Sequence, residues 1–198
     1  MNRYFFLVLI LFFACSNNIE TSQLQGGDQN GLNIIAYTVD CDQVRFYLEE
    51  ALRVDQGVRN GEIDMSMEEV DAANQALFYS IMQCCGADKI VGAGDQATRA
   101  AFFITQHAPL EFQLEYVNLF KEWSKEGIIS PSTFVLMVDR IRLRQGKTQL
   151  YGSQISTDES GVSKLSPIDD LDKVRARRDS LFMEPLEDYV ARFGVTLE

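Results

Sequence analysis

The chain has 198 residues, 46% of them hydrophobic, and its 29 acidic and 18 basic side chains give a net charge of −11 at neutral pH. Because phosphate recognition needs clustered lysines and arginines, we expect no nucleic-acid partner. The same charge balance argues against a polybasic membrane-binding surface. The length suits a single domain with a sizeable core.

The N-terminus resembles an export signal. Arg3 precedes an unbroken apolar run at residues 4–13, which is shorter than the roughly 20 residues of a membrane-spanning helix and typical of a signal peptide. The run ends at Ala14 and Cys15, which resemble the cleavage and lipidation site of bacterial lipoproteins. We therefore expect residues 1–14 to be a signal peptide and Cys15 to carry a lipid. The alternative is an ordinary secretory signal in which Cys15 is incidental.

The stretch after Cys15 is polar and contains several glycines. Residues 17–33 read "NNIETSQLQGGDQNGLN", a composition that buries too little apolar surface to order itself. We predict a lipid anchor and flexible tether at residues 15–39 and a single helical domain at 40–198. Ser16 and Asn17 provide no aspartate after the cysteine, which resembles an outer-membrane signal. The expected location is the cell envelope, with the protein lipid-anchored in the outer membrane and facing the periplasm.

Helical periodicity dominates the predicted domain. Ser66 and Glu69 have the spacing of a capping box that begins a helix. Small residues such as Ala97 and Ala100 indicate a helix that packs closely against its neighbours. The apolar periodicity predicts helices at residues 41–59, 67–84, 96–107, 110–125 and 131–145.

The composition changes after residue 147. Residues 148–168 are rich in Ser, Thr and Gly, which predicts either a β-hairpin turning at Asp158–Gly161 or an extended arm across the helices. Two shorter helical stretches follow, one ending near residue 178 and one at 185–192. The predicted fold class is mainly α: a compact multi-helix domain with a small extended or β-hairpin arm near 148–168.

Three cysteines follow Cys15, namely Cys41, Cys84 and Cys85. If Cys15 is acylated, this odd number allows at most one disulfide bond and leaves a free thiol. Both Cys41–Cys84 and Cys41–Cys85 are possible pairings. Zinc binding by these cysteines is not expected, because the sequence lacks a second cysteine or histidine cluster.

Several polar residues occupy positions where an amphipathic helix does not require them. Asp55 and Arg59 are one helical turn apart, and so are Asp71 and Asn74. His107, the single histidine of the chain, ends the predicted third helix. The candidate site residues are Asp55, Gln56, Arg59, Asp71, Asn74, Gln106, His107, Arg140, Gln149, Tyr151 and Gln154.

Two interpretations of these residues stay open. In the first they form a pocket in which His107 is a general acid/base, Arg140 clamps an anion, and Asp55 or Asp71 orients the histidine. Gly152 would then let the backbone approach the ligand. In the second they satisfy one another as a buried hydrogen-bond network that fixes the arm on the helices.

Six motifs carry a resemblance to a known family. They resemble domain-of-unknown-function family 6624, an uncharacterised and largely bacterial family, over about residues 40–190. The resemblance implies a mostly helical domain with a shared polar site and implies no activity. Pro109 and Ser153 depart from the family pattern, which more often has aspartate and threonine there. The motifs are "VDQGVR" (54–59), "VDAANQALFYSIMQCCG" (70–86), "FFITQHA" (102–108), "VDRI" (138–141), "QLYGSQ" (149–154) and "RARRDSLFMEPLEDY" (175–189).

We interpret the chain as a bacterial envelope lipoprotein with a binding or structural role that uses a polar groove around His107 and Arg140. Its partners would be the membrane, through the N-terminal lipid, and an unknown small molecule or protein. The alternative is a hydrolase or transferase with His107 as general acid/base. No cofactor motif is recognised, and no metal is expected because a single histidine with Asp55 or Asp71 is a poor zinc site.

Overall fold

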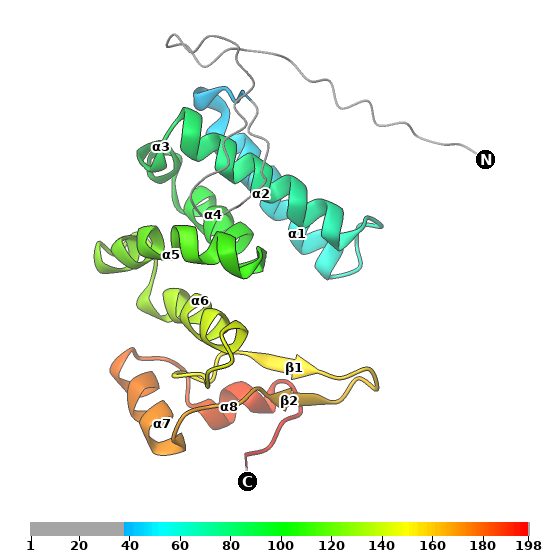
Figure 1. Ribbon diagram of the computed structural model, residues 1–198, viewed down its shortest axis with the longest axis vertical. Helices are drawn as coiled ribbons and strands as arrows, with labels where there is room; N and C mark the ends of the chain where they lie inside the picture. Colours follow the sequence, from blue (N-terminus) through cyan, green and yellow to red (C-terminus); the bar gives the residue numbers. More distant parts are fainter. Residues whose placement is uncertain (1–37, 198) are drawn as a thin grey trace, which may run out of the picture.

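The computed structural model describes residues 38–197, and its elements follow one another from one end of the molecule to the other (Figure 1). The expected signal peptide, the lipidation site and nearly all of the expected tether lie outside the described residues. The elements are η1 (Cys41–Gln43), α1 (Val44–Arg59), α2 (Met67–Cys84), α3 (Ala87–Gly92), α4 (Asp95–His107), α5 (Leu110–Lys125), α6 (Pro131–Arg144), β1 (Ile155–Thr157), β2 (Ser163–Leu165), α7 (Leu171–Ser180) and α8 (Leu186–Ala191).

The prediction of a mainly α fold with a small hairpin is confirmed. Two of the helices begin at serine residues that cap them, as serine commonly does. Ser66 Oγ accepts the Glu69 N–H at 3.4 Å at the start of α2, and Ser130 Oγ accepts the Thr133 N–H at 3.0 Å before Pro131. The short helix α3 was not predicted.

The main core lies among α1, α2, α4 and α5. The small residues Ala97, Ala100 and Ala101 on α4 are completely buried, which lets other helices approach α4 closely. An aromatic cluster fills the space beside them, and Phe78 packs edge-on against Tyr116 with 4.9 Å between ring centroids. Within this packed arrangement the end of α4 meets α1, where His107 contacts Asp55.

The arm (residues 148–168) contains the predicted hairpin. Strands β1 and β2 pair antiparallel, with Ile155 opposite Leu165. Asp158 Oδ1 accepts the N–H groups of Ser160 and Val162, both at 3.0 Å, and so closes the turn. In Figure 1 the hairpin extends beside α6 on one side and α7 and α8 on the other.

Gly152 has a left-handed backbone, with φ of 64°, at the point where the arm meets the C-terminal helices. A Cβ atom at this position would lie 2.7 Å from Leu186 Cδ1. The neighbour that requires glycine here is therefore α8. Leu186 belongs to a second, smaller core with Val174 and Val190.

A disulfide bond joins Cys41 to Cys85, with 5.5 Å between their Cα atoms. It ties η1 to the end of α2 and selects one of the two pairings that the sequence allowed. The expected free thiol is not found, because no cysteine of the described residues is free. Within residues 38–197, no helix combines the length and the apolar character needed to cross a membrane.

Candidate functional site

The arm is built around one buried carboxylate, that of Asp139 on α6, which is 0% exposed. Its Oδ1 accepts the Leu150 N–H at 2.7 Å and the Tyr151 N–H at 3.2 Å. Its Oδ2 accepts the Ser153 N–H at 3.0 Å and the Tyr151 N–H at 3.2 Å. Charge-assisted bonds from several backbone donors offset the cost of burying a carboxylate. Asp139 therefore fixes the path of the chain at residues 150–153.

Gln149 holds the two ends of the arm together. Its Nε2 donates to the carbonyl oxygens of Gln154 at 3.1 Å and Ser166 at 2.7 Å. Its Oε1 accepts the Gln154 N–H at 2.7 Å. The Gln149 side chain is completely buried, so these bonds satisfy both polar atoms of the carboxamide. The structure gives Gln149 a structural role in the arm.

Arg178 on α7 locks the arm from the other side. It is 2% exposed, and it donates to the carbonyl oxygens of Tyr151 and Glu184, both at 2.8 Å. Its guanidinium lies 5.0 Å from the ring centre of Tyr189, whose hydroxyl donates to the Ser153 carbonyl at 2.7 Å. Tyr151 thus takes part through its backbone.

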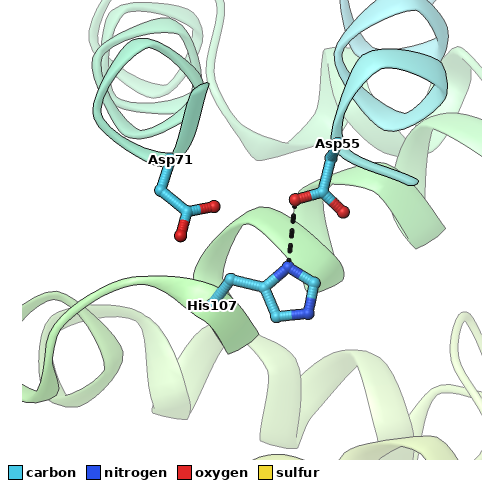
Figure 2. Close-up of side chains that lie close together, drawn as sticks. All are labelled: Asp55, Asp71 and His107. Carbon is cyan, nitrogen blue, oxygen red and sulfur yellow. Dashed lines mark hydrogen bonds and ion pairs between the residues drawn. The ribbon is translucent and has the colours of Figure 1, made fainter. Parts of the chain in front are cut away.

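His107, at the end of α4, meets Asp55 of α1. Its Nδ1 lies 3.2 Å from Asp55 Oδ1, and the side chains are 13% and 3% exposed. A carboxylate only accepts hydrogen bonds, so Nδ1 carries the proton of this contact, and in the uncharged form of the ring Nε2 is an acceptor. Figure 2 shows Nε2 on the side of the ring that faces away from Asp55.

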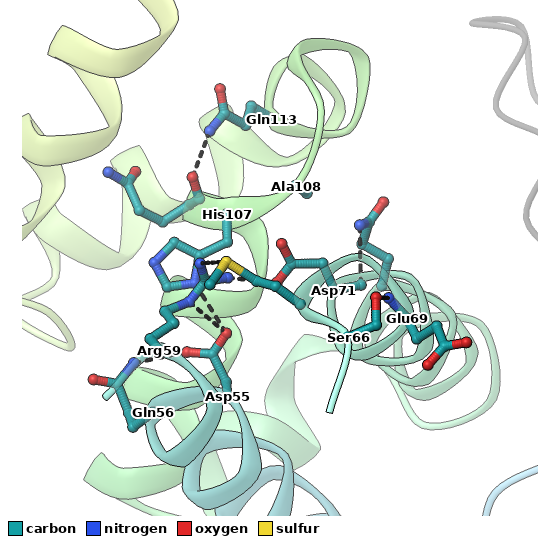
Figure 3. Close-up of polar contacts among 12 residues, drawn as sticks. Asp55, Gln56, Arg59, Ser66, Glu69, Asp71, His107, Ala108 and Gln113 are labelled. Carbon is teal, nitrogen blue, oxygen red and sulfur yellow. Dashed lines mark hydrogen bonds and ion pairs between the residues drawn. The ribbon is translucent and has the colours of Figure 1, made fainter. Parts of the chain in front are cut away.

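Arg59 joins this pair to Asp71 of α2. Its Nε donates to Asp55 Oδ1 at 2.9 Å, and its Nη2 donates to Asp71 Oδ1 at 2.5 Å (Figure 3). Gln56 Nε2 donates to the second oxygen of Asp55 at 2.7 Å. Both carboxylates are therefore held by one guanidinium, and Asp55 has three hydrogen-bond contacts in all.

The donor atoms of Asp55, Asp71 and His107 lie within 4.8 Å of one another, close enough to share a metal ion. However, the Arg59 guanidinium contacts both carboxylates. Asp55 Oδ1 would have to exchange its bonds from Arg59 and His107 for a metal bond. Among the described residues, the cation that fits between these carboxylates is Arg59 itself.

The two carboxyl groups have opposite pKa shifts. Burial raises the pKa of Asp55, but the hydrogen bond and charge of His107, with Gln56 and Arg59, outweigh it and hold the pKa below its usual range. Burial dominates at Asp71 and raises its pKa despite the nearby positive charges. Asp55 is therefore the more firmly ionised partner of the imidazole.

A pocket of about 270 Å³ lies between α4, α6, the arm and the C-terminal segment. Phe193, which is 44% exposed, lies at its rim. None of the described residues that line it is acidic, although the chain has 29 acidic side chains. The lining residues are Phe103, Gln106, His107, Leu136, Arg140, Ser153, Gln154, Ile155, Tyr189 and Phe193.

Arg140 supplies the positive charge of the pocket. Its Nε donates to Gln154 Oε1 at 3.0 Å. Its terminal amino groups have no hydrogen-bond acceptor anywhere in residues 38–197. Burial, followed by the charges of Arg144 and Arg59, lowers the pKa of Arg140 to about 10. The guanidinium is thus poorly compensated by the protein, while both amino groups remain available to a ligand.

The structure divides ten of the eleven predicted site residues into three sets. Asp55, Gln56, Arg59 and Asp71 form the cluster behind His107. Gln106, His107, Arg140 and Gln154 line the pocket. Gln149 and Tyr151 belong to the framework of the arm, and Asn74 is buried outside all three groups.

Two of these residues keep an unmatched polar atom. Gln106 donates through Nε2 to the Leu136 carbonyl at 3.2 Å, and its backbone oxygen accepts from Gln113 at 2.8 Å (Figure 3). Its Oε1 is buried without a partner among the described residues, as is Asn74 Nδ2. Buried polar atoms rarely lack a hydrogen-bond partner, so Gln106 Oε1 is an acceptor in the pocket wall that still requires a donor.

The predicted site residues leave out Arg178 and the apolar wall of the pocket, which consists of Phe103, Leu136, Ile155, Tyr189 and Phe193. A signal existed for Arg178, because it lies in the motif of residues 175–189. None existed for the apolar wall, since such residues are indistinguishable from core residues in a helical pattern.

The structure thus defines a small helical domain in which an arm contributes residues to the lining of a pocket. Residues 31–195 match the family of unknown function DUF6624, and the chain belongs to that family. Comparison with curated proteins and with solved structures gave no match. The family assignment confirms the resemblance seen in the motifs.

Proposed function

We propose that this protein binds a small anionic molecule in the pocket beside His107 and Arg140. The observation that carries the proposal is the Arg140 guanidinium, half-buried in the pocket wall with its terminal amino groups unmatched by any acceptor in residues 38–197. A carboxylate or phosphate group would accept from both amino groups in the planar geometry that arginine favours.

The charge distribution supports an anion over a cation. The chain carries a net charge of −11, yet the described residues that line the pocket include the basic side chains of His107 and Arg140 and no acidic one. The nearest carboxylates, Asp55 and Asp71, are engaged by Arg59 behind the histidine. An anion bound at Arg140 would meet no carboxylate on the pocket wall and would restore the usual charge balance around the guanidinium.

The size of the pocket limits the ligand. A volume of about 270 Å³ lies near the lower end of small-molecule sites. The pocket is therefore suited to a metabolite-sized molecule, and a folded protein partner would contact only its rim.

The test is ligand-induced thermal stabilisation of the mature protein, with inorganic phosphate and short carboxylates as probes. A probe that binds the folded state raises Tm as its concentration increases. Arg140→Gln should abolish this rise in Tm. Arg140→Lys should retain part of it, because lysine keeps the positive charge but lacks the planar pair of amino groups. Arg175→Gln is the matched control, since Arg175 is exposed on α7 and pairs with Glu187 at 2.6 Å. Stabilisation that survives unchanged in Arg140→Gln would refute the proposal.

A second function, acid–base catalysis, is favoured by the Asp55–His107 hydrogen bond of 3.2 Å. A buried carboxylate that holds Nδ1–H leaves Nε2 free to take a proton from a bound molecule. This gives His107 the role of general base and Asp55 that of the group that orients it. The reaction class would be hydrolysis or group transfer.

The single histidine makes the second function measurable. Nitrogen NMR of histidine-labelled protein should show one imidazole signal set with the proton on Nδ1, and Asp55→Asn should shift the tautomer towards Nε2–H. Hydrolysis of 4-nitrophenyl esters and phosphates should be lost in His107→Gln and reduced in Asp55→Asn. A dominant Nε2–H tautomer in the unsubstituted protein would contradict the assignment of His107 as a base.

We also propose that the protein is a lipoprotein of the bacterial cell envelope, anchored through Cys15 in the outer membrane. The Cys41–Cys85 disulfide supports an oxidising compartment. When the full-length chain is expressed in bacteria, it should partition with outer membranes, and Cys15→Ser should remain an unlipidated precursor. An unchanged mass and distribution of Cys15→Ser would refute lipidation at this position.

A further inference from the structure

We propose that the ligand is amphipathic, with an anionic group joined to a small apolar or aromatic body. This inference rests on the proposed anion binding and specifies its chemical class. It comes from the composition of the pocket wall, which contains five polar and five apolar residues. The apolar members are Phe103, Leu136, Ile155, Tyr189 and Phe193.

The helices place polar and apolar residues one turn apart. Phe103 precedes His107 by four residues on α4, and Leu136 precedes Arg140 by four residues on α6. Residues at this spacing share a helix face and are separated along it by about 5–6 Å. Each helix therefore presents an apolar side chain beside the polar side chain that follows it.

Hydrogen bonds hold these two helices together beside the pocket. Gln106 of α4 donates to the Leu136 carbonyl of α6 at 3.2 Å. Arg144 of α6 donates to the Ala108 carbonyl that follows α4. Both helices therefore contribute an apolar and a polar lining residue to the same wall, and Arg140 provides its positive charge.

The C-terminal segment completes the apolar part. Tyr189 and Phe193 are again four residues apart, and their ring centroids are 5.4 Å from each other. The Tyr189 hydroxyl is occupied by the Ser153 carbonyl, which leaves its ring as a contact surface. Phe193 remains 44% exposed. An inorganic anion would leave these rings in contact with water, whereas an attached apolar body would cover them.

The test compares three probes that differ in one part each: inorganic phosphate, phenyl phosphate and phenol. Calorimetric titration of the mature protein should give phenyl phosphate a Kd on the order of tenfold lower than that of phosphate, because partial burial of the ring removes apolar surface from water. Phenol should bind more weakly than phenyl phosphate. The same comparison between benzoate and acetate shows whether a carboxylate group can serve as the bound anion in place of a phosphate group.

Two phenylalanine variants locate the effect. Phe193→Ala should remove most of the tenfold advantage of phenyl phosphate over phosphate. Phe182→Ala is the matched control, since Phe182 is 97% exposed and does not line the pocket. Arg140→Gln should weaken phosphate and phenyl phosphate alike.

The possible results separate the two proposals. Equal affinities for phosphate and phenyl phosphate overturn the amphipathic class and leave anion binding intact. Equal affinities for phenol and phenyl phosphate, or an equal loss of phosphate and phenyl phosphate in Phe193→Ala, also overturn it. If none of the phosphates and carboxylates binds the unsubstituted protein, anion binding itself is wrong and the inference fails with it.

Discussion

Replacing Asp139 with asparagine should test how the arm is held on the helices. The carboxylate is 0% exposed and accepts the backbone N–H groups of Leu150, Tyr151 and Ser153. Asn has nearly the same shape, but only one of its side-chain positions accepts hydrogen bonds. Its amide nitrogen would point a donor at backbone donors, so at least one buried N–H would lose its partner.

The expected loss of stability follows from these hydrogen bonds. Hydrogen bonds to a charged group contribute about 1.5–3 kcal/mol each, and a buried donor left unmatched costs about 1–3 kcal/mol. Some of the donors can still share the remaining oxygen, so we expect Asp139→Asn to lower the free energy of unfolding by about 3 kcal/mol. For a domain of this size the corresponding fall in Tm is roughly 6–12 °C.

Urea unfolding followed by circular dichroism measures this difference directly, and equal slopes in the two proteins would show that the midpoints can be compared. Asp64→Asn provides the same chemical change on an exposed loop residue without a hydrogen-bond partner among residues 38–197. It should leave the midpoint within about 0.5 kcal/mol of the unsubstituted protein. If Asp139→Asn is as stable as Asp64→Asn, the carboxylate does not hold the arm and the reasoning is wrong.

Two further predictions concern Asp55 and the disulfide. The folded pKa of Asp55 is lowered, so its contribution is fully present above its unfolded pKa of about 3.9 and is lost as pH falls through the folded value. The stability gap between Asp55→Asn and the unsubstituted protein, measured by urea midpoints, should therefore be steady from pH 8 to about 5 and narrow below pH 4; a gap that stays constant at pH 3 would contradict this. Replacing both Cys41 and Cys85 with serine opens a link across 44 residues and should reduce the free energy of unfolding by about 2–4 kcal/mol. Reduction of the unsubstituted protein should have a similar effect, and an unchanged Tm after either treatment would show that the bond is not stabilising.

Helix boundaries were predictable where a capping residue fixes them. Ser66 and the Ser130-Pro131 pair cap α2 and α6 as the sequence indicates, because capping depends only on neighbouring backbone groups. The short helix α3 was missed since it spans only Ala87–Gly92 between glycine-containing turns, which is too little sequence for a periodic pattern.

The site was predictable in part for the same reason. Asp55 and Arg59 share a helix face, and their ion pair is local. The contact between Asp55 and His107 spans 52 residues. It depends on how closely α4, with its small alanine side chains, packs against the neighbouring helices. The apolar wall was not predictable, because Tyr189 and Phe193 reach the pocket through the fold of the C-terminal segment.

Asp139 and Arg140 are adjacent on α6 and connect the framework of the arm to the pocket. Asp139 binds the backbone at residues 150–153, while Arg140 binds the Gln154 side chain one residue further on. The Gln154 backbone is in turn held by Gln149. A ligand at Arg140 therefore contacts a residue whose position depends on the arm, so ligand affinity and arm stability should be linked reciprocally.

This linkage gives a last prediction, measured by amide hydrogen exchange. Saturating phenyl phosphate, or the tightest-binding probe of the series, should slow exchange at residues 150–154 in the unsubstituted protein, because Ser153 and Gln154 of the arm line the pocket. Asp139→Asn should bind the same probe more weakly although it retains Arg140. Arg140→Gln should show no protection of the arm at any probe concentration. If the probe binds with unchanged affinity to Asp139→Asn, or stabilises helices without protecting residues 150–154, the arm covers the pocket without contributing to it.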